Sequence, residues 1–258
     1  MYTLGIDCGS QNTKAVLVKD NEIAAIHMLP TDFDIQLAAD TVCSEVLAKA
    51  GITAEEVSKV VVTGSGRELI ENVPEKLNEV ASAGRGAKFM CPDASIVIDL
   101  GAESSRAISL KENGAIGDYA SNDKCASGSG TFIETMARTL QIATDEMGSY
   151  SLRHTKDISL VAQCVVFAES EVISLIHEQE TVENIVYGIL SGIANRIAGL
   201  VRRVATDETE AVLIGGPGLN VGLVDCLQKE TGKKMIVPEH VEYISALGAA
   251  LYAATLVE

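Results

Sequence analysis

Apolar and polar positions near the start of the chain predict three strands, a helix and a fourth strand. The strands at 2–7 and 14–19 flank a polar loop, DCGSQNTK, and a third strand follows at 22–29. Residues 35–50 place apolar side chains with the period of a helix. The short apolar run KVVVTG at 59–64 ends in glycine, which is typical of a buried strand.

The same order of elements begins again at SIVIDLG, residues 95–101, a strand that runs into a glycine turn. RAISLKENGAIGDYA, residues 106–120, predicts a hairpin with Asn113-Gly114 at its turn. The remaining pattern predicts helices at about 128–140, 168–178, 182–205 and 245–256, and strands at 211–214 and 234–238.

The repeat predicts an α/β protein with two halves of like topology facing one another across a cleft. Asp7-Cys8-Gly9 and Asp99-Leu100-Gly101 occupy matching places in the two halves. Pro92 and Asp93 suggest the boundary, which gives halves at 1–93 and 94–258. The C-terminal helix at about 245–258 is free to pack back on the first half.

Composition and net charge narrow the range of partners and of cellular locations. The 258 residues are 47% hydrophobic and carry a net charge of −16, which disfavours nucleic acid and anionic membranes as partners. An acidic surface is also ordinary for soluble proteins. The first segment, YTLGID, predicts a strand rather than a signal peptide, so we expect a cytoplasmic protein. Its six cysteines are then expected to be free thiols or metal ligands rather than disulfides.

Three glycine loops, at 7–14, 99–103 and 215–218, carry the candidate nucleotide chemistry. Glycine lets backbone N–H groups approach phosphate oxygens closely. An aspartate at the end of a buried strand can hold Mg²⁺, usually through the waters of the ion. A single such loop is most often a structural turn, but three in order favour a magnesium-phosphate site.

Two cysteines precede predicted helices. Cys125 lies just before SGSG, and Cys164 lies before the helix near Ala168. The N-terminus of a helix favours a thiolate, which is the form that binds metal. Neither belongs to a CxxC pair, and a lone cysteine is more often a small buried hydrophobe. If both are ligands, a second chain has to supply the other two of a four-ligand site.

DCGSQNTK, DLGAES and GGPGLN resemble the two phosphate loops and the adenosine loop of the actin, Hsp70 and sugar-kinase superfamily. This resemblance implies ribonuclease-H-like halves around an ATP cleft. NDKCASGSGTFIETMARTL and CVVFAESEVISLI resemble one branch, the BadF/BadG/BcrA/BcrD type. That branch contains the activators of 2-hydroxyacyl-CoA dehydratases, the ATP-binding subunits of benzoyl-CoA reductases and the reductases of double-cubane-cluster proteins.

The resemblance implies roles for residues of all three loops. Asp7, Asp99 and Glu103 would be catalytic, with Glu103 placing the attacking water. The expected contacts to Mg-ATP are made by Gly9, Ser10, Gln11, Asn12, Thr13, Lys14, Gly101, Ala102, Gly215, Gly216, Pro217 and Asn220. The activators usually read DIGGQD where this chain has DLGAES, so an acidic side chain stands where a glutamine would orient the water.

The resemblance further implies one [4Fe–4S] cluster per dimer, held by Cys125 and Cys164 of each subunit. The partners would be a second copy or a related chain, a ferredoxin or flavodoxin donor, and an iron–sulfur dehydratase or reductase as electron acceptor. Two alternatives remain open at this point. One is a small-molecule kinase with Asp123 as general base, and the other is a non-catalytic nucleotide-dependent regulator.

Overall fold

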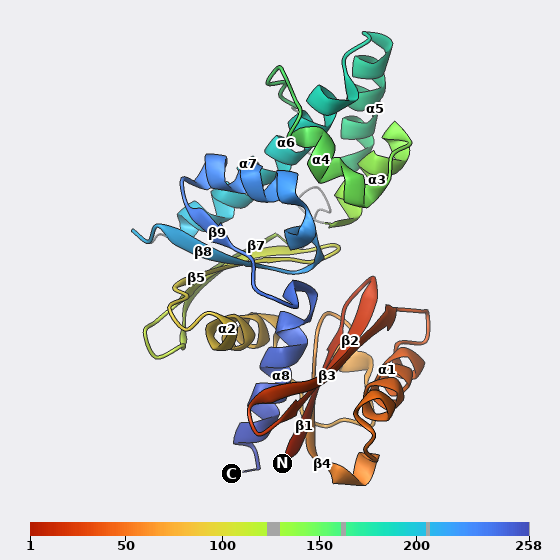
Figure 1. The fold of residues 1–258 in the computed structure, drawn as a ribbon, viewed down its shortest axis with the longest axis vertical. Coiled ribbons are helices and arrows are strands. Elements are labelled where there is room, and N and C mark those ends of the chain that lie inside the picture. Colours follow the sequence, from red (N-terminus) through yellow and green to blue (C-terminus); the bar gives the residue numbers. More distant parts are fainter. Residues whose placement is uncertain (123–129, 161–163, 205–206, 258) are drawn as a thin grey trace. The chain divides into compact units, whose positions relative to one another are not determined.

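The computed structural model describes residues 1–122, 130–160, 164–204 and 207–257 (Figure 1). The chain forms two units. The first unit contains Met1–Ala94, Leu110–Ile116 and Pro238–Glu258, and the second contains Ser95–Ser109 and Gly117–Val237. The sequence had placed the boundary between residues 93 and 94 and left the C-terminal helix free to pack back on the first half; the segment Pro238–Glu258 belongs to the first unit.

The first unit is built on a four-stranded sheet in the order β3-β2-β1-β4. The pairs β1–β2 and β2–β3 are antiparallel, and β1–β4 is parallel. The elements are β1 (Tyr2–Cys8), β2 (Asn12–Lys19), β3 (Glu22–Pro30), α1 (Ile35–Ala50), β4 (Val57–Thr63), α2 (Glu79–Met90) and α8 (Ile244–Thr255), with short 3-10 turns at Ala54–Glu56, Arg67–Leu69 and Val241–Tyr243.

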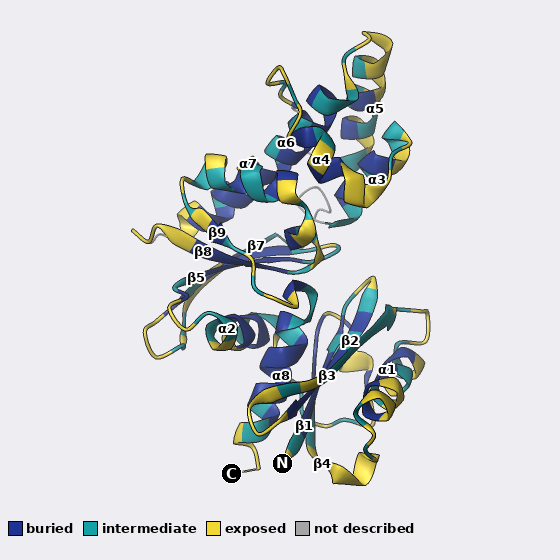
Figure 2. Ribbon diagram, viewed as in Figure 1, coloured by how far each residue is buried: buried dark blue, intermediate teal, exposed yellow. Residues whose placement is uncertain are grey.

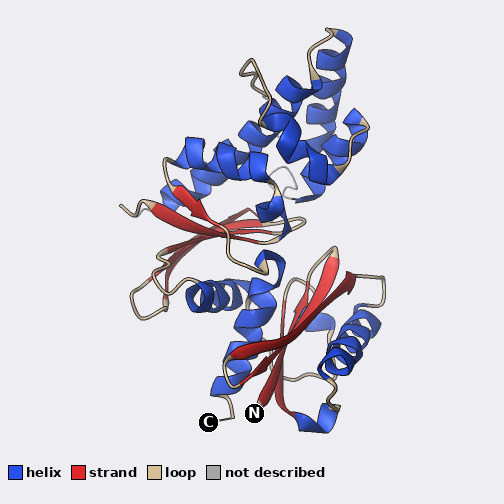
Figure 3. Ribbon diagram, viewed as in Figure 1, coloured by secondary structure: helices blue, strands red, loops and turns tan. Residues whose placement is uncertain are grey.

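Helices cover both faces of this sheet (Figure 3). Leu17 packs with the buried residues of α1, whereas Val16 and Val18 pack with those of α8. Successive side chains of a strand point to opposite faces, so α1 and α8 lie on opposite sides of the sheet. The start of α1 is fixed by Asp34, whose carboxylate accepts a hydrogen bond from the N–H of Leu37 at 2.9 Å.

Glycines let α8 approach its neighbours at backbone contact. A Cβ added at Gly5 of β1 would lie 2.0 Å from the carbonyl oxygen of Ala246. A Cβ at Gly86 of α2 would lie 2.0 Å from that of Ile244, and one at Gly248 of α8 would lie 1.9 Å from that of Ser82. Any side chain at these three positions would therefore push α8 away from β1 or α2.

The second unit contains a five-stranded sheet in the order β7-β6-β5-β8-β9. Its strands are β5 (Ile96–Leu100), β6 (Ser105–Leu110), β7 (Ile116–Asn122), β8 (Glu210–Ile214) and β9 (Lys234–Ile236). Its helices are α3 (Gly130–Leu140), α4 (Met147–Ser151), α5 (Val165–His177), α6 (Val182–Arg203) and α7 (Val221–Thr231), with 3-10 turns at Thr144–Glu146 and Gly216–Leu219.

Helix α6 is the centre of the second core (Figure 2). Among the described residues it is the one helix long and apolar enough to cross a bilayer, but 67% of its apolar window is buried inside the protein. Ile185, Ile189, Ile193 and Ile197 of α6 are buried together with side chains of the sheet and of the neighbouring helices. Its apolar surface is therefore used by the core of the second unit.

Candidate functional site

The first predicted phosphate loop is the tight connection between β1 and β2. The N–H of Gly9 donates to the carbonyl oxygen of Asn12 at 3.2 Å and closes the turn. A Cβ at Gly9 would lie 2.8 Å from that oxygen, so the turn requires glycine. Ser10 and Gln11 are exposed at the tip, where their polar groups can meet a ligand.

A charged pair stands at the base of this loop. Asp7 and Lys14 are direct partners in the antiparallel β1–β2 ladder. The Nζ atom of Lys14 lies 3.3 Å from Oδ2 of Asp7, and the two side chains are 16% and 13% exposed. Lys14 thus remains accessible enough to contact an anion while staying next to the carboxylate.

Thr31, which no sequence motif indicated, braces the first loop. Its hydroxyl donates to the carbonyl oxygen of Gly9 at 2.8 Å, and its N–H donates to that of Gln11 at 2.9 Å. The hydroxyls of Thr13 and Thr31 lie 2.8 Å apart. The buried Thr13 hydroxyl is therefore engaged within the protein, and the expected contact of Thr13 with phosphate stays a prediction.

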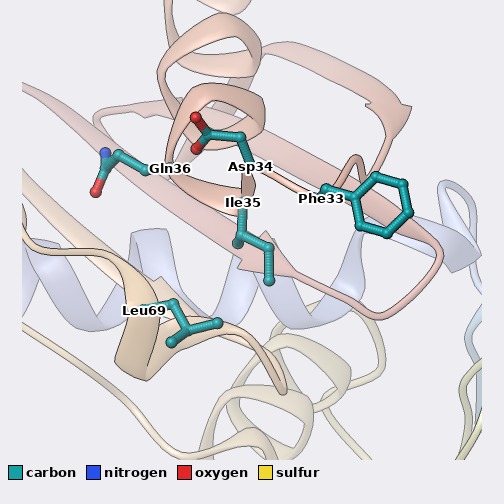
Figure 4. A pocket seen from close by; sticks show the side chains of 5 residues that line it. All are labelled: Phe33, Asp34, Ile35, Gln36 and Leu69. Atoms are coloured by element: carbon teal, nitrogen blue, oxygen red, sulfur yellow. The ribbon is translucent and has the colours of Figure 1, made fainter.

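A shallow groove of about 450 Å³ lies beyond this brace and is lined by Phe33, Asp34, Ile35, Gln36 and Leu69 (Figure 4). None of the predicted site residues lines it. The residues that line the groove come shortly after Thr31 and Gly66 in the chain. The N–H of Gly66 donates to the carbonyl oxygen of Cys8 at 2.9 Å. The groove belongs to the first unit and is distinct from the phosphate loop itself.

The second predicted phosphate loop repeats the geometry of the first. It connects β5 to β6, and the N–H of Gly101 donates to the carbonyl oxygen of Ser104 at 2.8 Å. Asp99 and Arg106 are direct partners in the antiparallel ladder, with Nη1 of Arg106 3.0 Å from Oδ2 of Asp99. Glu103 is exposed at the tip of this loop.

The second loop is joined to the start of α3. The carbonyl oxygens of Gly101 and Ala102 accept hydrogen bonds from the N–H groups of Gly130 and Thr131, both at 2.9 Å. These donors belong to the first turn of the helix, where N–H groups lack partners within the helix. Displacement of the loop would therefore be transmitted directly to α3.

The predicted adenosine loop lies against the second phosphate loop within the second unit. Gly215 has φ +91° and ψ 163°, and a Cβ there would lie 2.0 Å from the carbonyl oxygen of Leu100. A Cβ at Gly130 would lie 3.4 Å from Pro217 and 3.5 Å from Ala102. The structure thus brings both loops and the beginning of α3 together, and Gly216 is exposed among them.

Asn220 has a structural task in this loop. It is the N-cap of α7, and its side-chain oxygen accepts a hydrogen bond from the N–H of Leu223 at 3.0 Å. Capping fixes the direction in which the chain leaves the glycine loop. The expected contact of Asn220 with adenosine stays a prediction.

Of the two predicted cluster ligands, Cys164 is described and Cys125 lies outside the described residues, as does Asp123. Cys164 is the N-cap of α5 and is exposed, with no capping hydrogen bond from its side chain. Within the described ranges, no group of three or more histidine, cysteine, aspartate or glutamate side chains forms a metal site. The thiol of Cys164 is open to solvent at a helix N-terminus, which suits a site completed by other segments.

The other described cysteines are less accessible. Burial raises the pKa of Cys8 to about 12, with a smaller contribution from the Asp7 carboxylate. Burial also raises the pKa of Cys43 to about 12 and that of Cys226 to about 11. Burial raises the pKa of Cys91 as well. High pKa values disfavour the thiolate, so these four side chains are poor metal ligands at neutral pH.

Paired hairpin loops and a glycine loop on an α/β framework define an ATPase of the actin, Hsp70 and sugar-kinase fold class. A glucokinase from Streptomyces griseus shares this fold, with a TM-score of 0.63 at 14% identity. More specifically, the chain belongs to the BadF/BadG/BcrA/BcrD ATPase family, whose sequence profile matches residues 4–253. The predicted fold class and family are both confirmed.

Relatives of this family match nearly the full chain. The 2-hydroxyisocaproyl-CoA dehydratase activator of Clostridioides difficile is 35% identical over 98% of this chain and 95% of its own length. Its structure with bound ADPNP has a TM-score of 0.93 at 34% identity and covers 100% of this chain and 96% of that one.

Two further relatives agree with this assignment. Component A of the (R)-2-hydroxyglutaryl-CoA dehydratase of Acidaminococcus fermentans has a TM-score of 0.95 at 33% identity, covering 100% and 99% of the two chains. A subunit of the benzoyl-CoA reductase of Thauera aromatica is 33% identical over 98% of this chain and 93% of its own length.

Proposed function

We propose that this chain is an ATP-dependent reductase component that couples Mg-ATP binding and hydrolysis to one-electron transfer into an iron–sulfur partner enzyme. The partner would be of the 2-hydroxyacyl-CoA dehydratase, benzoyl-CoA reductase or double-cubane-cluster type, and a reduced ferredoxin or flavodoxin would be the donor. The similarity to dehydratase activators and to a component of benzoyl-CoA reductase supports an acceptor of this kind.

One observation carries the proposal. The second phosphate loop accepts hydrogen bonds from Gly130 and Thr131 at the start of α3, directly after the segment that contains Cys125. Helix α3 in turn contacts α5, where the Thr139 hydroxyl donates to Glu169 at 3.2 Å. A change at the nucleotide could thus reach both helices that follow the candidate ligands, provided that ATP binds one arrangement better than the other.

Each residue of the loops has a distinct task in this proposal. Backbone N–H groups of both turns would cradle the phosphates, with Lys14 adding a positive charge. The carboxylates of Asp7 and Asp99 fit Mg²⁺, because this ion prefers oxygen ligands and keeps several of its waters. Glu103, exposed at the tip of the second loop, would place the attacking water. The bound ADPNP in the C. difficile relative supports nucleotide binding by this chain.

The chemical fit of the candidate cluster site is favourable. Cys164 offers an exposed thiol at the N-terminus of α5, where N–H groups stabilise negative charge. Cys125 and Cys164 from two copies would hold a [4Fe–4S] cluster, which supplies one-electron redox chemistry when bound. The protein residues around it would supply the ligands, exclude solvent and change its surroundings as α3 and α5 move.

Iron content tests the proposal. Protein purified without oxygen should be brown and contain about four irons per dimer, because two copies supply four thiolates. Cys125→Ala and Cys164→Ala should lose the iron but still bind ADPNP, and Cys91→Ala is the matched control that should keep it. A colourless wild-type protein that cannot be loaded with iron, and that phosphorylates a small molecule, would refute the proposal in favour of a kinase.

A further inference from the structure

The two phosphate loops are copies of one hairpin, and the copy extends to a residue outside the glycine turn. DCGSQNTK and DLGAESSR align without a gap, so Asp7 corresponds to Asp99 and Lys14 to Arg106. In both hairpins the aspartate is the penultimate residue of its strand, and its direct ladder partner is the basic residue. Arg106 is therefore the second-unit equivalent of Lys14.

Arg106 and Lys14 differ in their exposure and in their distance from the paired aspartate. Arg106 lies 3.0 Å from Asp99 with both side chains 9% exposed, whereas Lys14 lies 3.3 Å from Asp7 and is 16% exposed. Arg106 also belongs to β6, which is flanked by β5 and β7 in the sheet. An arginine stays charged in such surroundings and presents a planar set of donors that matches a carboxylate. A lysine keeps a mobile point charge.

We propose that Arg106 is a positioning residue for ATP hydrolysis, which holds the Asp99 carboxylate in the orientation that would face the magnesium waters. Lys14 serves the nucleotide directly, and Arg106 serves it through Asp99. The aspartate–cation pair of the two loops would thus have a different task in each: contact with the nucleotide by Lys14, and orientation of Asp99 by Arg106. The inference rests on the proposed role of Asp99 at Mg-ATP, but not on electron transfer or on a cluster.

Removal of a group that orients a metal-binding residue typically costs about tenfold to a hundredfold in metal affinity or activity. Arg106→Met should therefore lower kcat/KM for Mg-ATP by about that factor. In a binding assay with ADPNP, the gain in affinity that Mg²⁺ gives the wild-type protein should largely disappear, while affinity in EDTA should change little. Arg106→Lys should recover most of the gain, because a cation still faces Asp99.

Lys111→Met, an exposed charge loss just beyond β6, is the matched control and should behave as wild type. Asp99→Asn should also remove the Mg²⁺ gain, and adding Arg106→Met to it should cause no further loss in that gain. If Arg106→Met fails to fold, the double variant removes both buried charges and is expected to fold better.

These outcomes distinguish a failure of the proposed function from a failure of the proposed role of Arg106. A wild-type protein without Mg-ATP hydrolysis would refute the proposed function itself. A wild-type ATPase whose folded Arg106→Met variant keeps the full Mg²⁺ gain would refute only the role of Arg106. Independent, additive losses from Asp99→Asn and Arg106→Met would refute it as well, because a residue that acts through Asp99 has nothing left to position.

Discussion

Replacing Gly215 by alanine should weaken both the second unit and its nucleotide loops. The backbone at φ +91° and ψ 163° lies in a region that only glycine adopts freely, which costs about 1–3 kcal/mol for another residue. The new Cβ would also lie 2.0 Å from the carbonyl oxygen of Leu100, and overpacking of this kind costs about 1–3 kcal/mol. The free energy of unfolding should fall by about 2–6 kcal/mol, measured in urea.

Nucleotide affinity should fall in the same variant. The Leu100 carbonyl immediately precedes Gly101, so relief of the clash displaces the second phosphate loop, which titration calorimetry with ADPNP would detect. Gly232→Ala is the matched control, because Gly232 has φ +67° but nothing within 4 Å of an added Cβ. It reports the backbone cost alone, about 1–2 kcal/mol. Equal losses of stability in the two variants, with unchanged affinity in both, would refute the reasoning.

Three further results are expected. Gly248→Ala should destabilise the first unit by about 1–3 kcal/mol in urea unfolding, because its Cβ would meet the Ser82 carbonyl at 1.9 Å; Gly199→Ala, a helical glycine of α6 whose added Cβ would meet no atom nearer than 4.0 Å, is its control, and equal losses would contradict the contact. Glu103→Gln should change the rate of ATP turnover in a phosphate-release assay and spare ADPNP affinity; an unchanged rate removes Glu103 from the mechanism. In cluster-free protein at pH 8, iodoacetamide should label the exposed Cys164 well before Cys8, as peptide mass spectrometry would show. The pKa of Cys8 is raised to about 12, so its reactive thiolate forms only as the pH approaches that value; equal labelling at pH 8 would contradict its burial.

Local signals were sufficient to predict the two hairpin turns that the phosphate loops were assigned to. An aspartate near the end of a buried strand and a glycine after it lie close together in the chain, and this holds for both hairpins. Helix α2 was not predicted, because Gly84 and Gly86 weaken its helical propensity. Its stability comes from packing against α8, which is encoded more than a hundred residues away, and tertiary contacts of this kind are not visible in a local window.

Two residues next to the predicted loops, Thr31 and Arg106, were not predicted, because their partners lie on other strands. Thr31 braces the first loop from the end of β3, and nothing in its own neighbourhood indicates this task. The pairing of Arg106 with Asp99 depends on the register of β5 and β6. An alignment of the two loops would have indicated it, because Arg106 then matches Lys14. Cys125 and Cys164 were assigned from family resemblance, since no spacing within this chain predicts a shared site.

The contact between β1 and α8 has a consequence for how the protein is made. Thr3 donates to the carbonyl oxygen of Ala250, a partner 247 residues later in the chain, and Gly5 packs on the same helix. On the ribosome, β1 emerges well before α8 and must therefore wait for that helix before one face of its sheet is covered. The second unit, whose residues all precede α8, can fold during that wait. Changes that slow α8 docking should thus appear as aggregation of newly made chains, even where the finished protein is stable.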